Sequence, residues 1–93
     1  MEIKQGNNQF YIGEETHPLA EITYYVKSDR VIAADHTYVS EELRGQGIAN
    51  KLLERLAAFA REKQLLIEPI CSFVKREFDR SDAYADLDAS KQK

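Results

Sequence analysis

The chain has 93 residues, enough for one domain and too few for two, so we expect residues 1–93 to form a single domain. Its 13 basic and 16 acidic side chains are interspersed and give a formal net charge of −3. Nucleic acid is therefore not an expected partner, because nucleic-acid-binding surfaces carry dense positive charge. The single cysteine allows no internal disulfide. The N-terminus lacks the apolar core of a signal peptide, and no apolar run approaches the roughly 20 residues that span a bilayer. We expect a cytoplasmic protein without a membrane partner.

The N-terminal third of the sequence predicts antiparallel strands. Residues 6–8, Gly-Asn-Asn, tolerate positive φ and separate a strand expected over residues 2–5 from one over residues 9–12, which predicts a hairpin. From Leu19 to Val26 polar and apolar residues alternate, with Val26 on the same face as Ala20, Ile22 and Tyr24. Residues 31–39 are rich in β-branched and aromatic side chains and predict another strong strand.

The pattern changes at Ser40, where a glycine-containing loop precedes a helix. Apolar residues at i, i+4 spacing predict a helix from Ile48 to about Lys63. A short apolar run over residues 65–70 predicts a buried strand, and a second helix is expected over about residues 72–79. Only Tyr84 and Leu87 are expected to anchor the polar tail, whose last residues, 90–93, should fray.

This order of elements predicts the fold class. A strand, a loop, a helix and a strand in succession form a βαβ crossover, so the strands over residues 31–39 and 65–70 should be parallel. We expect a minimal mixed α/β sheet with N-terminal antiparallel strands, one crossover and a short C-terminal helix.

The loop between the crossover strand and its helix is the candidate binding site. The first amides of a helix have no intrahelical partner and carry partial positive charge, so an anion such as a phosphate is well accommodated there. Gly45 and Gly47 lack the Cβ atoms that would keep a diphosphate from the main chain, and Arg44 adds a cation. Alternatively, the two glycines only make the turn. The loop is neither a P-loop nor a complete dinucleotide fingerprint.

The loop sequence also resembles a known family. It is similar to the Gln/Arg-x-x-Gly-x-Gly/Ala signature of the GNAT N-acetyltransferase superfamily, through Arg44, Gly45, Gln46, Gly47, Ile48 and Ala49. The runs over residues 36–39, 43–49 and 67–75 resemble the small YjdJ-like branch of that superfamily. Proteins of this branch begin with a Met-Glu-Ile-like strand and carry a Pro-x-Cys segment, here residues 69–71.

The resemblance implies that acetyl-CoA lies where the two crossover strands part. Main-chain groups near Val39 would bond the pantetheine arm, and the amides of residues 44–49 would hold the diphosphate. Full-length members have extra N-terminal helices and C-terminal strands that build the acceptor pocket, for which this chain has no room. The acceptor site is therefore expected to be open, completed by a second subunit, or absent, in a monomer or a homodimer.

Three residues are the leading catalytic candidates. Cys71 is expected at a helix N-terminus, where the dipole favours its thiolate, and could be a nucleophile, a contact of CoA, or only a small buried hydrophobe. His36 could be a general base or a half-buried packing residue that shares its strand face with Tyr38, Ala34 and Ile32. Tyr38 could protonate the leaving thiolate.

Other candidates are less specific. Tyr84 is a second possible proton donor. The superfamily often uses a carboxylate as base, and Asp35 and Glu68 are its nearest analogues here. His17, His36 and Cys71 lack metal-ligand spacing, so no metal is expected.

Together these features predict an acetyl-CoA-dependent N-acetyltransferase that acts on an amine of a small molecule or a protein. Two alternatives remain open on the sequence alone. The chain could be a non-enzymatic acyl-CoA-binding sensor or interaction module, or a structural domain in which the loop is only a turn.

Overall fold

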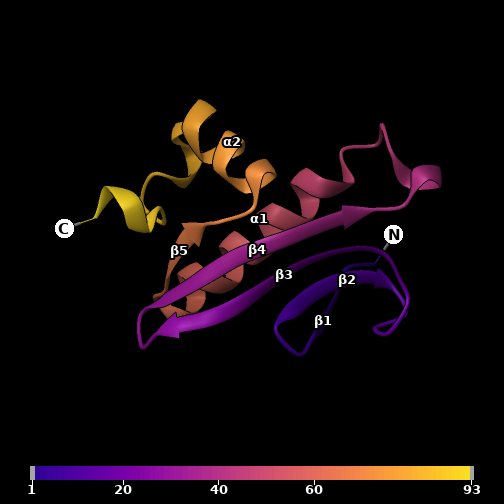
Figure 1. Ribbon diagram of the computed structural model, residues 1–93, viewed down its shortest axis with the longest axis horizontal. Helices are drawn as coiled ribbons and strands as arrows, with labels where there is room; N and C mark the ends of the chain where they lie inside the picture. Colours follow the sequence, from indigo (N-terminus) through magenta and orange to yellow (C-terminus); the bar gives the residue numbers. More distant parts are fainter. Residues whose placement is uncertain (1, 93) are drawn as a thin grey trace.

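The computed structural model describes residues 2–92, which form one five-stranded sheet with two α-helices. The strands are β1 (Lys4–Gly6), β2 (Gln9–Gly13), β3 (Pro18–Ser28), β4 (Val31–Val39) and β5 (Leu66–Pro69). They lie in the order β1-β2-β3-β4-β5, with antiparallel pairing from β1 to β4 and parallel pairing of β4 with β5 (Figure 1). The predicted mixed α/β fold class and the parallel crossover are confirmed.

The N-terminal hairpin forms, although its first strand is displaced from the prediction. Gly6 belongs to β1 and pairs with Gln9, so the strand covers residues 4–6 rather than 2–5. The turn is the pair Asn7-Asn8, and Asn8 adopts a left-handed conformation with φ 57°. Asparagine tolerates this conformation better than most residues, which explains why no glycine is needed there.

The long helix α1 (Ile48–Lys63) has the bounds that its apolar periodicity predicts. Its buried stripe packs against the sheet and includes Ile48, Leu52, Leu53, Leu56, Ala57 and Ala60. Gln64 ends the helix in a left-handed conformation, φ 59°, and its amide bonds to the carbonyls of Ala60 and Arg61. The preceding loop contains a short 3-10 helix, η1 (Glu41–Leu43), which was not predicted.

A β-bulge reverses the two faces of β4 part-way along the strand. Tyr24 pairs with Ala34 and Thr23 pairs with His36, so Asp35 is an extra residue with no partner on β3. Directly paired residues lie on the same face of a sheet. An extra residue shifts the alternation by one position, and side chains after it change face.

The prediction that His36 shares a face with Ala34 and Ile32 is therefore wrong. Ala34 lies on the face that α1 covers, whereas His36 and Tyr38 lie with Thr23 and Glu21 on the other face. The residues of the far half of β4 that turn toward the helix are Thr37 and Val39, since they pair with the core residues Ile22 and Ala20.

At the other end of the β3–β4 hairpin, Val26 is 64 % exposed, although it alternates with buried residues. Its partner is Ile32, and the register shifts between Val26 and Ser28 close to the turn. The core stops short of this tip, so sharing a face with Tyr24 does not bury Val26.

The second helix, α2 (Ser72–Arg80), lies beside α1 and joins the same core. Val74 and Phe78 are fully buried, and Phe73 packs at the margin of the core. The preceding strand β5 is shorter than predicted, because its pairing with β4 ends at Ala34 and Pro69.

The polar tail is more ordered than its composition predicts. It contains two 3-10 turns, η2 (Asp82–Tyr84) and η3 (Ala89–Lys91), the second of which overlaps the residues predicted to fray, and residue 93 lies outside the described residues. Leu87 is buried as predicted, and its carbonyl accepts a bond from the Ile67 amide at 2.7 Å. The tail thus lies along the outer edge of β5.

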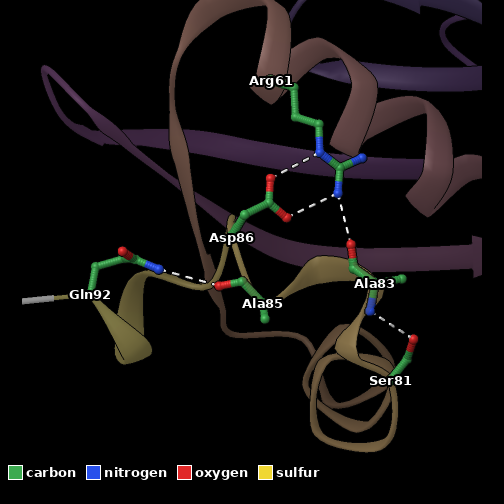
Figure 2. Close-up of polar contacts among 6 residues, drawn as sticks. All are labelled: Arg61, Ser81, Ala83, Ala85, Asp86 and Gln92. Carbon is green, nitrogen blue, oxygen red and sulfur yellow. Dashed lines mark hydrogen bonds and ion pairs between the residues drawn. The ribbon is translucent and has the colours of Figure 1, made fainter.

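Arg61 of α1 fastens this tail from the side (Figure 2). Its guanidinium donates to both carboxylate oxygens of Asp86, each at 3.1 Å, and to the Ala83 carbonyl at 2.8 Å. A bidentate contact of this kind fixes the orientation of the two side chains as well as the distance between them. The hydrogen bond to Arg61 lowers the pKa of Asp86 below its ordinary value.

Candidate functional site

A hollow of about 170 Å³ lies at the N-terminus of α1. Its lining comes from the end of β4, from the glycine loop and from the first turn of the helix: Val39, Arg44, Gly45, Gly47, Ile48, Ala49 and Asn50. Six of these belong to the predicted cofactor-binding set, and the predicted Cys71 does not line the hollow. Asn50 was not predicted, and Gln46 is absent from the lining.

The helix end that faces this hollow is open. Its N-cap is Gly47, which offers no side chain to satisfy the first-turn amides. The first backbone bond of the helix runs from the Lys51 amide to the Gly47 carbonyl at 3.1 Å. The preceding amides, including those of Ile48 and Ala49, donate to no side-chain acceptor within residues 2–92. These donors remain available to an anion.

The two loop glycines are required by backbone geometry. Gly45 has φ 83° and Gly47 has φ 71°, values that side-chain-bearing residues rarely adopt. A Cβ added at either position would meet no heavy atom within 4 Å. No side chain or backbone of the protein therefore fills the space beside Gly45 and Gly47.

Arg44 and Gln46 make local contacts in this loop. The Arg44 Nε donates to the Val39 carbonyl at 3.3 Å, so the guanidinium lies across the end of β4. The Gln46 amide donates to the Glu42 carbonyl at 3.5 Å, a long contact that directs it toward η1. Arg44 is exposed and lines the hollow.

The two parallel strands part next to this loop. Their pairing ends at Ala34 and Pro69, while β4 continues to Val39. The Ala34 carbonyl accepts bonds from the amides of Ile70 at 3.1 Å and Cys71 at 2.9 Å, so the chain leaves the sheet at that point. The parallel ladder therefore ends five residues before β4 does.

Cys71 lies where this ladder ends, as the N-cap of α2. Its Sγ lies 3.5 Å from the Thr37 Oγ1 of β4. Burial raises the pKa of the Cys71 thiol, but hydrogen bonds with Thr37 and with the amides of Val74 and Phe73 outweigh burial, and the pKa lies below its ordinary value. The thiol is half-buried and packs against the edge of the hydrophobic core.

His36 and Tyr38 lie on the opposite face of β4, away from the helices. His36 is exposed, not half-buried, with 56 % of its side chain accessible, and its Nε2 lies 3.7 Å from the Glu21 Oε2. Tyr38 is 41 % exposed and pairs in register with Glu21. The bulge at Asp35 therefore places His36 and Tyr38 on the face of β4 opposite Thr37, the residue that contacts Cys71.

The remaining candidates have partners elsewhere. Asp35 accepts a bond from the Thr23 hydroxyl at 2.7 Å, and Glu68 pairs with Lys27. Tyr84 lies in the tail and stacks on Phe78 of α2, with ring centroids 5.3 Å apart. Burial, and then the charges of Glu54 and Glu77, raise the pKa of Tyr84.

Sequence reasoning missed three residues of this region: Thr37, Glu21 and Asn50. Thr37 and Glu21 are placed by strand pairing, which the bulge alters. A polar Asn50 in the first turn of an otherwise apolar helix face was the one available signal.

Comparisons with known proteins agree with this geometry. A family model described as GCN5-related N-acetyl-transferase matches residues 9–87. The chain belongs to the GCN5-related N-acetyltransferase family. As a family member it is an acetyltransferase.

Solved structures show the same fold. A GCN5-like protein from Staphylococcus aureus, determined by NMR, is 49 % identical over 92 % of this chain and 85 % of its own, with a TM-score of 0.80. A GNAT acetyltransferase from Elizabethkingia anophelis with acetyl-CoA bound is 14 % identical, with a TM-score of 0.59 over 77 % of this chain and 50 % of its own. A Mycobacterium tuberculosis protein in complex with CoA is also 14 % identical, with a TM-score of 0.56 over 85 % and 62 %. Among curated proteins, none matches at a significant level.

Within residues 2–92, no three His, Cys, Asp or Glu side chains come together as a metal site. No helix in that part of the chain combines the length and apolar content required to cross a membrane.

Proposed function

We propose that this protein is an acetyl-CoA-dependent N-acetyltransferase that transfers the acetyl group to an amine. We assign it to the small YjdJ-like branch and treat residues 1–93 as one catalytic domain. We place it in the cytoplasm, where the free Cys71 thiol stays reduced.

The observation that carries this proposal is the open N-terminus of α1. Uncapped amides, two glycines at positive φ and a hollow of about 170 Å³ coincide at one helix end. This arrangement suits a diphosphate, with the amides of residues 44–49 as donors and Arg44 as the cation. The main chain near Val39 would hold the pantetheine arm along the end of β4.

The two faces of β4 suggest how the chemistry is divided. Cys71 and Thr37 adjoin the gap on the helix side, where the hollow lies, and His36 and Tyr38 adjoin it on the open face. The acceptor amine would approach across the open face. Within residues 2–92 no helix covers that face, so the acceptor is an exposed amine of a protein or a small molecule, bound by a monomer or across a homodimer.

Each candidate side chain has one proton to hold or move. Acetyl-CoA supplies an activated acetyl thioester. His36 Nε2 would remove the proton that the amine loses, and Glu21, 3.7 Å away, would orient the ring. Tyr38 or Cys71 would give a proton to the leaving sulfur, so that one proton leaves the amine and one reaches the thiolate. The acidic Cys71 thiol also allows a contact with the thioester, or an attack on it.

Thermal unfolding with and without acetyl-CoA tests the binding site. A ligand at about 100 times its dissociation constant stabilises the fold by about 2.7 kcal/mol. We expect acetyl-CoA to raise the melting temperature of the wild type but not of Gly47→Glu, whose carboxylate enters the diphosphate site. The melting temperature of ligand-free Gly47→Glu reports backbone strain separately. An equal rise in both proteins would disprove the proposed site.

Release of CoA in the presence of a panel of amines tests turnover. We expect release to depend on both acetyl-CoA and an amine. Binding without release on any amine would instead favour an acyl-CoA sensor, and neither binding nor release would favour a structural role for the loop.

A further inference from the structure

Helices α1 and α2 contribute to one apolar core and share one polar contact. Val74 and Phe78 of α2 are fully buried in the core that they share with Leu52 and Leu53 of α1. Among residues 2–92, a single side-chain hydrogen bond joins the two helices. The Asn50 Nδ2 donates to the Glu77 Oε1 at 3.0 Å.

Glu77 is an unusual residue for a helix-packing surface. Only 6 % of it is exposed, and its second carboxylate oxygen pairs with the Arg80 Nε at 3.1 Å. Burying a carboxylate is costly, and well-packed apolar residues often stabilise such a contact more than a charged group does. Stability alone therefore does not account for a buried carboxylate at this contact.

The position of the bond indicates another role. Asn50 lies in the first turn of α1 and lines the hollow that we assign to the diphosphate. Glu77 lies six residues after Cys71, which is about 9 Å along α2 at 1.5 Å per residue. One hydrogen bond thus connects the wall of the hollow to the helix whose N-cap is Cys71.

We propose that Asn50 is a positioning residue that acts through Glu77 to couple occupancy of the hollow to the setting of Cys71. This inference rests on the proposed function, because it requires the hollow to bind a diphosphate. A ligand that draws in the first turn of α1 moves Asn50, and the bond transmits that movement to α2. The thiol contacts with Thr37 and with the first amides of α2 then change.

The test uses ADP carrying a 3′-phosphate, a fragment with the diphosphate of CoA but no pantetheine arm. Such a fragment cannot shield Cys71 directly. It is added until the backbone amide resonances of residues 44–49 stop moving, and the rate of Cys71 alkylation by iodoacetamide is then compared with and without it. In the wild type we expect the rate to change by about fivefold or more, the lower end of ordinary coupling between sites.

Variants separate coupling from folding. In Asn50→Ala the fragment should still move the loop resonances at saturation, while the alkylation rate changes less than twofold. Glu77→Gln keeps a carbonyl oxygen for Asn50 and should retain most of the wild-type change, whereas Glu77→Ala should lose it. Lys51→Ala, an exposed neighbour on the same helix, is the matched control and should behave as wild type.

Three outcomes are decisive. Saturation of the loop without any change at Cys71 in the wild type overturns the coupling and leaves the proposed function intact. A full change that persists in Asn50→Ala overturns the role of Asn50. If the fragment never moves the loop resonances, the hollow is not a diphosphate site, and the proposed function fails together with the inference.

Discussion

Cys71 and Thr37 face each other across the point where β4 and β5 part, with 3.5 Å between the sulfur and the hydroxyl oxygen. In the thiol form the sulfur donates to the hydroxyl. In the thiolate form the direction reverses and the hydroxyl donates, which stabilises the negative charge. The hydrogen bond between Thr37 and Cys71 therefore helps to set the fraction of thiolate at a given pH.

Thr37→Val should raise the pKa of Cys71 toward its ordinary value. The thiolate forms as pH rises, so a higher pKa moves the alkylation rate profile to higher pH and lowers the rate at neutral pH. The rate of reaction with iodoacetamide across a pH series measures this shift. Thr37→Ser keeps the hydroxyl and should match the wild type. A profile that stays in place in Thr37→Val would mean that the helix amides alone set the pKa.

His36→Ala should lower kcat by about 10²–10⁴, the usual contribution of a general base. A general base acts only in its unprotonated form, so the acidic limb of the kcat/KM profile should disappear with the imidazole. The control is His17→Ala, an exposed histidine in the turn between β2 and β3. If the acidic limb survives in His36→Ala, the base is another group, and Asp35 is the next candidate on this strand.

Gly45→Ala should destabilise the fold without any steric clash. The added Cβ meets nothing within 4 Å, but φ 83° costs a side-chain-bearing residue about 1–2 kcal/mol. For a domain of this size each kcal/mol lowers the melting temperature by about 4–8 °C. Asparagine tolerates left-handed backbone better, so Gly45→Asn should lose less. Equal losses in both variants would show that conformation is not the cause.

The buried side chain of Leu87 should contribute more to the free energy of unfolding than the ion pair of the tail does. Leu87→Ala removes a side chain that is 3 % exposed and should cost about 2–5 kcal/mol. The Arg61–Asp86 pair is largely exposed, so Arg61→Ala should cost at most about 1 kcal/mol. Urea unfolding monitored by circular dichroism measures both.

The contribution of the ion pair should also depend on pH. The folded protein lowers the pKa of Asp86, so this contribution is complete above the ordinary carboxyl pKa, near 4, and is lost as pH falls through the lower folded value. The difference in stability between wild type and Arg61→Ala should therefore vanish in acid. A constant difference from neutral pH to strong acid would contradict the assignment.

Local pattern was sufficient for much of this fold. The i, i+4 spacing from Ile48 gave both bounds of α1, and the order of elements predicted the parallel crossover. The glycine loop lies at a helix N-terminus because Gly45 and Gly47 adopt positive φ where the chain turns into α1. These features depend on residues close together in sequence, and their physical causes are local.

Features that depend on residues far apart in the sequence could not be predicted from local pattern. The bulge at Asp35 is a property of the pairing between β3 and β4, and strict alternation along β4 put His36 on the wrong face. The bond between Asn50 and Glu77 joins residues 27 positions apart. Leu87 was predicted to be an anchor, but its partner Ile67 is on another element and could not be named.

The carbonyl of Leu87 occupies the outward amide of Ile67, and this has a consequence for assembly. The unpaired backbone groups of an edge strand can hydrogen-bond with a strand of a neighbouring molecule. On the β5 side the tail occupies this position instead. A second copy of the chain could pair with β5 only after the tail is displaced. That displacement would expose the buried Leu87 and break the contacts of Arg61 with Asp86 and Ala83. Self-association by sheet extension is thus directed to the opposite margin, where β1 offers only three residues.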